Sequence, residues 1–201
     1  MIISSAKPFE EILSSLDRYD DIFVIGCNVC AAKLHLGGEP EVLDMCECLR
    51  NAGKNVVGWI LPTAACSVQS WESLVEKNPA IEDARAILVM GCGSGTSVVA
   101  SVVDVPVYSS NDTTSLGGLS NDVVLHDQCA MCGKCIIADF GGVCPTTQCA
   151  KGLLNGPCGG SMNGRCEVDR ETDCAWELIY KRLKIIGRLD LLDELHEPKE
   201  H

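Results

Sequence analysis

The segment DIFVIGCNVC, residues 21–30, places a short apolar run in front of a glycine and two cysteines. Similar apolar runs follow at residues 55–61, 85–90 and 105–110, and helical patterns lie between them. Strands that alternate with helical segments indicate βαβ units and a parallel sheet. We therefore predict an α/β fold: a small Rossmann-like or flavodoxin-like parallel-sheet domain with three layers, over residues 1–120.

The helix predicted over residues 39–54 has an apolar face that carries Val42, Leu43, Cys46 and Leu49. Cys46 is expected to be a small core residue on this face, whereas Cys48 lies on the other side of the helix. Further helices are predicted from Ser67 onward and over residues 94–103.

The apolar runs of the first half are followed by cysteines. Cys27 and Cys30 follow the first run, Cys66 follows the second and Cys92 follows the third. The carboxyl ends of parallel strands share one edge of the sheet, where ligands bind. The four thiols are therefore predicted to converge on one metal site, and helix dipoles at that edge favour an anionic, thiolate-ligated cluster. The alternative is that they are buried structural thiols.

The second half of the chain contains CAMCGKC at residues 129–135. The spacing C-x2-C-x2-C is typical of a loop that binds an iron–sulfur cluster, because it lets three sulfurs meet one cluster. Zinc sites usually combine paired C-x2-C units, often with histidine, and the Cys-rich stretch 127–174 has neither. The chain has fourteen cysteines in total, which a reducing cytosol would not keep as disulfides, so metal binding is the expected use.

Five more cysteines follow this motif, and the glycines of residues 155–166 allow the backbone to approach a cluster closely. We predict a loop-dominated, cysteine-rich metal-binding module with C-terminal helices over residues 121–201. Its eight thiols could hold two [4Fe-4S] clusters, or one cluster and one zinc ion, which makes two or three clusters for the whole chain. The predicted metal ligands are Cys27, Cys30, Cys66, Cys92, Cys129, Cys132, Cys135, Cys144, Cys149, Cys158, Cys166 and Cys174.

The segment after Cys174 is helical and has an apolar stripe. Gly187 is expected to end this helix, and a short second helix follows. The stripe is predicted to pack against the α/β domain, with a surface for a partner protein as the alternative. Its members are Trp176, Ile179, Tyr180, Leu183 and Ile186.

Charge and hydropathy exclude several classes of protein. The formal net charge of −12 argues against binding to nucleic acid, because phosphate groups repel an acidic surface. No apolar run approaches the ~18 residues that cross a bilayer, and the N-terminal segment lacks the pattern of a signal peptide. We expect a cytoplasmic protein that does not bind membranes.

The segment GCGSGT, residues 91–96, offers a competing hypothesis. It follows a predicted strand, opens a helix and precedes Asp112, as in dinucleotide-binding enzymes, but its third glycine is misplaced. The histidines at 35, 126, 196 and 201 are isolated and are expected to be solvated or capping residues. We therefore predict no catalytic residue, and an uncertain, non-catalytic place in an oxidoreductase complex.

Residues 144–192, and NGPCGGSMNGRCEVD at 155–169 above all, resemble the methylenetetrahydrofolate reductase C-terminal domain family. The order GCNVC, LGGE and VVGW in the first half is also similar to small iron–sulfur subunits that accompany methylenetetrahydrofolate reductase in acetogenic bacteria.

The resemblance implies an electron-transfer subunit of one-carbon (Wood–Ljungdahl) metabolism. Such a subunit delivers electrons to the flavin of a separate catalytic subunit that reduces methylenetetrahydrofolate, and a further complex could supply the electrons. Clusters pass electrons singly, so a flavin is needed to convert them to a hydride equivalent. The alternative is a zinc-binding scaffold subunit of the same complex.

Overall fold

The computed structural model describes residues 1–198 of the 201-residue chain. The chain divides into two compact units, Met1–Thr114 and Ser115–His201, each with its own hydrophobic core. The division falls six residues before the predicted boundary at residue 120.

The first unit contains a parallel sheet with the strand order β3-β2-β4-β5. The sequence prediction of a parallel α/β fold is confirmed for this unit. In this order the first strand of the sheet lies between the second and the third, as in flavodoxin-like folds. The strands are β2 (Asp21–Ile25), β3 (Asn55–Ile60), β4 (Ala86–Val89) and β5 (Val107–Ser109).

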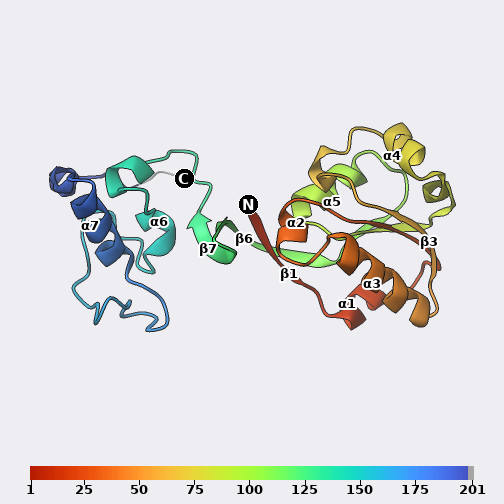
Figure 1. The fold of residues 1–201 in the computed structure, drawn as a ribbon, viewed down its shortest axis with the longest axis horizontal. Coiled ribbons are helices and arrows are strands. Elements are labelled where there is room, and N and C mark those ends of the chain that lie inside the picture. Colours follow the sequence, from red (N-terminus) through yellow and green to blue (C-terminus); the bar gives the residue numbers. More distant parts are fainter. Residues whose placement is uncertain (199–201) are drawn as a thin grey trace. The chain divides into compact units, whose positions relative to one another are not determined.

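Helices cover both faces of this sheet (Figure 1). The alternation of side chains along β2 explains the two layers: Ile22 and Val24 pack in one core, and Phe23 and Ile25 in the other. Helices α1 (Phe9–Ser15) and α3 (Glu39–Asn51) cover the first face. The second face is covered by α2 (Cys30–Lys33), α4 (Trp71–Lys77), α5 (Gly93–Ala100) and the 3₁₀ turns Ala65–Ser67 and Pro79–Asp83.

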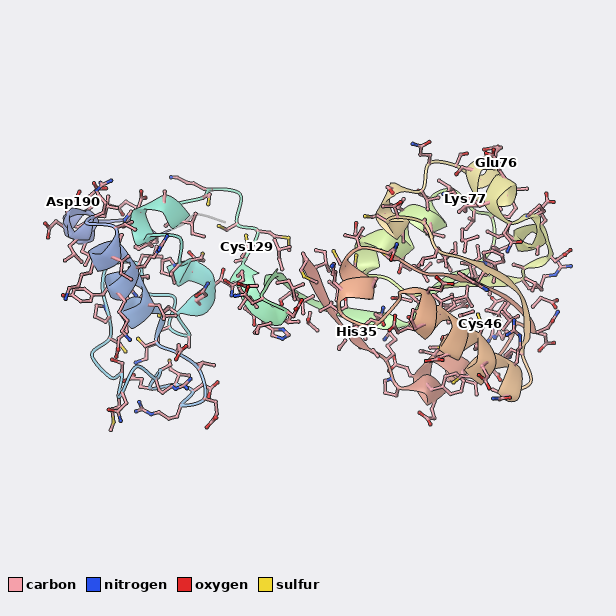
Figure 2. All side chains as sticks on the ribbon, in the orientation of Figure 1. His35, Cys46, Glu76, Lys77, Cys129 and Asp190 are labelled. Atoms are coloured by element: carbon pink, nitrogen blue, oxygen red, sulfur yellow. The ribbon has the colours of Figure 1, made fainter. Side chains whose placement is uncertain are left out.

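Helix α3 agrees with the sequence prediction except at one position. Val42, Cys46 and Leu49 are buried, and Cys48 is exposed on the other side, as expected. Figure 2 labels Cys46 on this helix. Leu43 is 45% exposed, so its assignment to the apolar face is wrong. Adjacent residues of a helix point about 100° apart, and the stripe i, i+4, i+7 that begins at Val42 leaves Leu43 at its margin.

The helix predicted from Ser67 begins later than expected, at Trp71. The Ser70 hydroxyl accepts a hydrogen bond from the Ser73 N–H at 3.3 Å, which satisfies an N–H group of the first turn. A serine in this position ends the preceding loop and starts the helix, so Ser67 remains in a 3₁₀ turn.

A second sheet was not predicted. Its strand order is β1-β6-β7, with β1 at Ile2–Ala6, β6 at Asn111–Ser120 and β7 at Val123–Cys129. Strands β6 and β7 form an antiparallel hairpin whose two loop residues, Asn121 and Asp122, both have positive φ. Such loops favour Asn and Asp, because these residues tolerate the left-handed region.

The second unit has a small core around Phe140, which Trp176, Ile179 and Leu183 complete. The predicted stripe of α7 (Ala175–Ile185) thus packs within its own unit, and the prediction that it packs against the α/β domain is wrong. Tyr180 is half-exposed on the same helix. The other helical segments are α6 (Pro145–Gln148) and the 3₁₀ turns Ile137–Phe140 and Leu189–Asp193.

Among residues 1–198, no helix combines the length and the apolar character that crossing a membrane requires.

Candidate functional site

Four cysteines of the first unit line one cavity of about 140 Å³. They are Cys27, Cys30, Cys66 and Cys92, the four that follow the predicted strands. The remaining lining is mostly apolar and includes Ile2, Val29, Ala31 and Ala64. The cavity is roughly ten times larger than the ~10–15 Å³ that one water molecule needs.

The strand order explains why these thiols meet. Cys27 follows β2 and Cys92 follows β4, which are adjacent parallel strands. The crevice between their carboxyl ends is the point where the chain changes direction across the sheet, and ligands bind there in open α/β folds. Cys30 begins α2, and Cys66 lies in the 3₁₀ turn after β3.

The four thiols differ in their surroundings. The Cys27 side chain is buried, those of Cys30 and Cys92 are partly exposed, and that of Cys66 is exposed. The backbone N–H of Ile2 donates a hydrogen bond to Cys30 Sγ at 3.4 Å.

Two glycines let the backbone close around the cavity. A Cβ on Gly37 would lie 2.0 Å from the Met90 carbonyl oxygen, and Gly37 accepts a hydrogen bond from the Cys27 N–H at 2.8 Å. A Cβ on Gly95 would lie 3.0 Å from Ala65 Cβ, in the turn that carries Cys66. The glycines of GCGSGT therefore bring α5 close to that turn.

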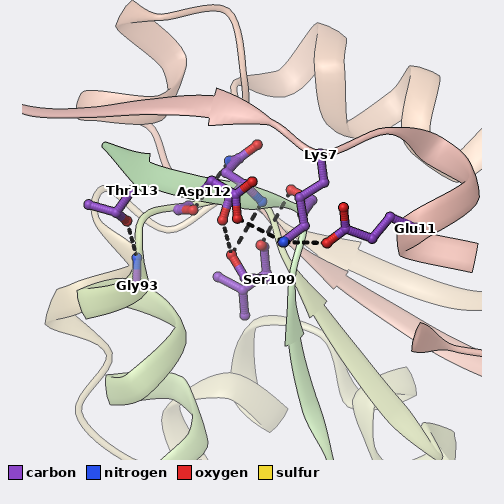
Figure 3. A network of polar contacts seen from close by, with 10 residues as sticks. Lys7, Glu11, Gly93, Ser109, Asp112 and Thr113 are labelled. Carbon is purple, nitrogen blue, oxygen red and sulfur yellow. Dashed lines mark hydrogen bonds and ion pairs between the residues drawn. The ribbon is translucent and has the colours of Figure 1, made fainter. Parts of the chain in front are cut away.

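Asp112, the acidic residue that the competing dinucleotide hypothesis requires, forms an ion pair with Lys7. Lys7 Nζ lies 2.8 Å from Asp112 and 2.5 Å from Glu11, and the Gly93 N–H donates to Thr113 Oγ1 at 2.8 Å (Figure 3). Hydrogen bonds from Lys7 to Asp112 and to Glu11 raise the pKa of this lysine. Asp112 thus anchors the segment between β1 and α1, and Ile2 and Ser4 of β1 line the cysteine cavity.

The eight cysteines of the second unit lie in loops and at the ends of elements. Cys129 ends β7 (Figure 2), and Cys132 and Cys135 follow it. Cys144 and Cys149 flank α6, and Cys174 precedes α7. Cys158 and Cys166 lie in the glycine-rich loop between these helices.

Polar groups contact several of these sulfurs. The Met131 N–H donates to Cys129 Sγ at 3.4 Å, and the Thr147 hydroxyl donates to Cys144 Sγ at 3.5 Å. Backbone N–H groups of Asp169 and, to a lesser degree, Val168 lower the pKa of the Cys166 thiol. The lowered pKa of Cys166 favours its thiolate form, which is the form that binds metals.

Within residues 1–198, no three His, Cys, Asp or Glu side chains are arranged to hold a metal ion. The ligand role of the twelve cysteines therefore stays a prediction, although four of them share a cavity.

Sequence reasoning missed the contribution of the N-terminal strand and of Gly37. The signal for the strand was weak, since IISSA has only two adjacent apolar residues before polar ones. Gly37 stands in LGGE, a motif noted only for its resemblance, and its close approach to Met90 depends on tertiary contacts.

Comparison with known proteins finds a family match in the second half of the chain. Residues 108–201 match the family described as "Methylene-tetrahydrofolate reductase C terminal". The match covers slightly less than half of the chain and supports the relationship to methylenetetrahydrofolate reductase that the sequence resemblance implies. No curated protein matches the chain.

One solved structure is described as a branched-chain amino acid ABC transporter from Rhodospirillum rubrum. It is 18% identical, with a TM-score of 0.31, over 51% of this chain and 28% of that protein. The chain thus spans under a third of that protein's length, and a similarity this low carries no argument.

Proposed function

We propose that this protein is an iron–sulfur electron-transfer subunit that delivers electrons to the flavin of a partner methylenetetrahydrofolate reductase subunit. The observation that carries the proposal is the cavity that Cys27, Cys30, Cys66 and Cys92 line at the switch point of the parallel sheet. The match of residues 108–201 to the reductase C-terminal family supports the choice of partner.

The donor set fits a cluster better than a zinc ion. Zinc holds thiolates at ~2.3 Å, so the sulfurs of a tetrahedral site lie within about 3.8 Å of one another. In a cubane cluster each thiolate would bind a different iron atom, so the cysteine sulfurs would lie farther apart than they do around one zinc ion. The cavity has room for more than one ion.

The residues around the cavity would hold the cluster and exclude water. Cys27, Cys30, Cys66 and Cys92 would be its ligands, and the cluster would supply one-electron transfer. The Ile2 N–H donates to Cys30 Sγ and thereby stabilises negative charge on that sulfur. The apolar side chains of Ile2 and Val29 also line this edge.

The cysteines of the second unit extend the proposal to a second site. CAMCGKC supplies Cys129, Cys132 and Cys135 in cluster-binding spacing. N–H and O–H donors already contact Cys129 and Cys144. One further cluster or a zinc ion would take the remaining thiols of this unit. We infer that the second unit brings a cluster near the partner's flavin.

Anaerobic purification followed by iron, zinc and acid-labile sulfide analysis tests the metal content. We expect brown protein with iron and sulfide in equal amounts. Cys92→Ala should lose one cluster's worth of iron and keep the rest, whereas the matched control Cys48→Ala, on the exposed side of α3, should lose none. A colourless, folded protein that contains only zinc would instead support the scaffold alternative.

The partner is tested by mixing this chain with a flavin-containing reductase subunit and a low-potential electron donor. We expect the flavin to be reduced faster in the presence of this chain. Equal rates with and without it would refute electron transfer.

A further inference from the structure

A cavity of the second unit is lined by no cysteine. Its volume is about 410 Å³, within the ~300–1,000 Å³ typical of small-molecule sites. Helix α7, the loop from Leu154 to Ser161 and the segment from Leu191 to Glu194 surround it. None of the predicted metal ligands lines this cavity, although Cys158 lies in its loop between the lining residues Pro157 and Gly159.

Three aromatic side chains form its apolar walls: Phe140, Trp176 and Tyr180. The rings of Phe140 and Trp176 are perpendicular, with centroids 5.8 Å apart. The Trp176 indole N–H donates to the Leu153 carbonyl at 3.0 Å, so its polar edge is satisfied and its orientation is fixed. Tyr180 lies one helical turn beyond Trp176 on the same side of α7.

The charges at the cavity are unbalanced. Glu177 and Lys181 form an ion pair at 3.8 Å, which leaves little net charge between them. Glu194 also lines the cavity and takes part in none of the ion pairs found among residues 1–198. The nearby Arg188 forms an ion pair with Asp190 at 3.0 Å and also has a weaker electrostatic attraction to Glu194. The lining therefore carries one more carboxylate than cations, and Glu194 is exposed to solvent.

The wall that carries Glu194 is held in place by a specific contact. The Asn155 side chain makes two hydrogen bonds to the backbone of His196: its Nδ2 donates to the carbonyl at 2.9 Å, and its Oδ1 accepts from the N–H at 2.8 Å. The His196 ring also packs on Phe140, with centroids 4.7 Å apart. This contact fixes the segment from Leu191 to His196 over the cavity.

The surroundings of His196 differ from the solvated tail expected from the sequence. Its Nε2 is buried and has no hydrogen-bond partner among the described residues. An unpaired buried nitrogen costs free energy, so the packing on Phe140 and the two hydrogen bonds to Asn155 must outweigh that cost. His201, the other histidine of this tail, lies outside the described residues.

We propose that this cavity binds a small amphipathic organic cation, an amine or amidine on a compact apolar body. Aromatic faces attract a cation through their quadrupole, and the apolar walls bury the body of the ligand. The Glu194 carboxylate supplies the opposite charge. An anionic ligand would meet that carboxylate and is disfavoured. The proposed site differs from the cysteine cavity of the first unit.

Three probes of similar shape test the charge preference on the full chain: phenethylamine, 2-phenylethanol and phenylacetate. Calorimetry near physiological ionic strength should give tighter binding of the amine than of the alcohol by at least about tenfold. Hydrogen exchange should show that the amine protects the segments 154–161 and 189–196. No binding at millimolar concentration, equal binding of amine and alcohol, or a preference for phenylacetate would overturn the proposal.

Substitutions test whether Glu194 supplies the negative charge that binds the amine. Glu194→Gln should abolish the preference for the amine, whereas Glu197→Gln, an exposed carboxylate of the same tail that does not line the cavity, should leave it unchanged. Tyr180→Ala should weaken the binding of the amine. The fold should tolerate this substitution, because the Tyr180 ring is half-exposed. An equal loss in both Gln variants would mean a general attraction to an acidic surface, and the proposed site would be wrong.

Discussion

Gly37→Ala should destabilise the first unit at the point where the cysteine cavity is built. The added Cβ would lie 2.0 Å from the Met90 carbonyl oxygen and 2.9 Å from its carbon, where ordinary contacts begin at 3.4 Å. About 1.4 Å must therefore open between the loop and the end of β4. Both partners are backbone atoms, so no side-chain rotation can relieve the contact.

The size of the destabilisation by Gly37→Ala can be estimated from the packing and the hydrogen bonds around the contact. Overpacking of a close-packed region costs about 1–3 kcal/mol. The hydrogen bonds from Cys27 N to Gly37 O and from Met90 N to Ile25 O, each 2.8 Å, lie on either side of the contact. Loss of one of them adds about 0.5–1.5 kcal/mol, which gives an expected loss of about 1.5–4.5 kcal/mol in the free energy of opening.

Native-state hydrogen exchange with peptide-resolved mass spectrometry measures this loss, because it reports each unit separately. Amides of β2 and β4 should lose protection, whereas those of α7 in the second unit should not. The matched control is Gly93→Ala, whose Cβ would meet Thr113 Oγ1 at 3.6 Å, an ordinary contact; it should change the free energy by less than about 0.5 kcal/mol. Equal effects of the two variants would refute the reasoning.

Two further predictions concern packing and thiol chemistry. Phe140→Ala should cost about 3–5 kcal/mol and remove the protection of α7 amides in hydrogen exchange, because Phe140 is the centre of the small second core; retained protection would show that other forces hold this unit. Burial raises the pKa of the Cys46 thiol, so the folded state keeps this proton when the unfolded state loses it. Its contribution to stability is therefore complete below the unfolded pKa of about 9 and declines as the pH rises further. In alkaline unfolding, the protein should therefore lose stability with rising pH more steeply than Cys46→Ala does. Iodoacetamide should label the exposed Cys48 of the folded protein much faster than Cys46.

The sequence alone was enough for the parallel sheet, because its strands are short apolar runs bounded by polar segments. It was also enough for the common edge of Cys27, Cys66 and Cys92, since residues that follow parallel strands meet at one edge. The opposite environments of Cys46 and Cys48 followed from helical periodicity. Each of these inferences rests on local pattern and on a general rule of chain direction.

Tertiary structure decided what depends on contacts between distant segments. Strand β1 and the β6–β7 hairpin carry mostly polar or mixed sequence, so their pairing was not visible as hydrophobic alternation. The stripe of α7 was recognised, but periodicity states only that a face is buried and not against which partner; Phe140 supplies that partner. The role of Gly37 and the partial burial of the His196 ring could likewise not be predicted from local sequence patterns. Both result from contacts across long sequence separations, with Met90 and with Asn155, and only the folded chain brings those atoms together.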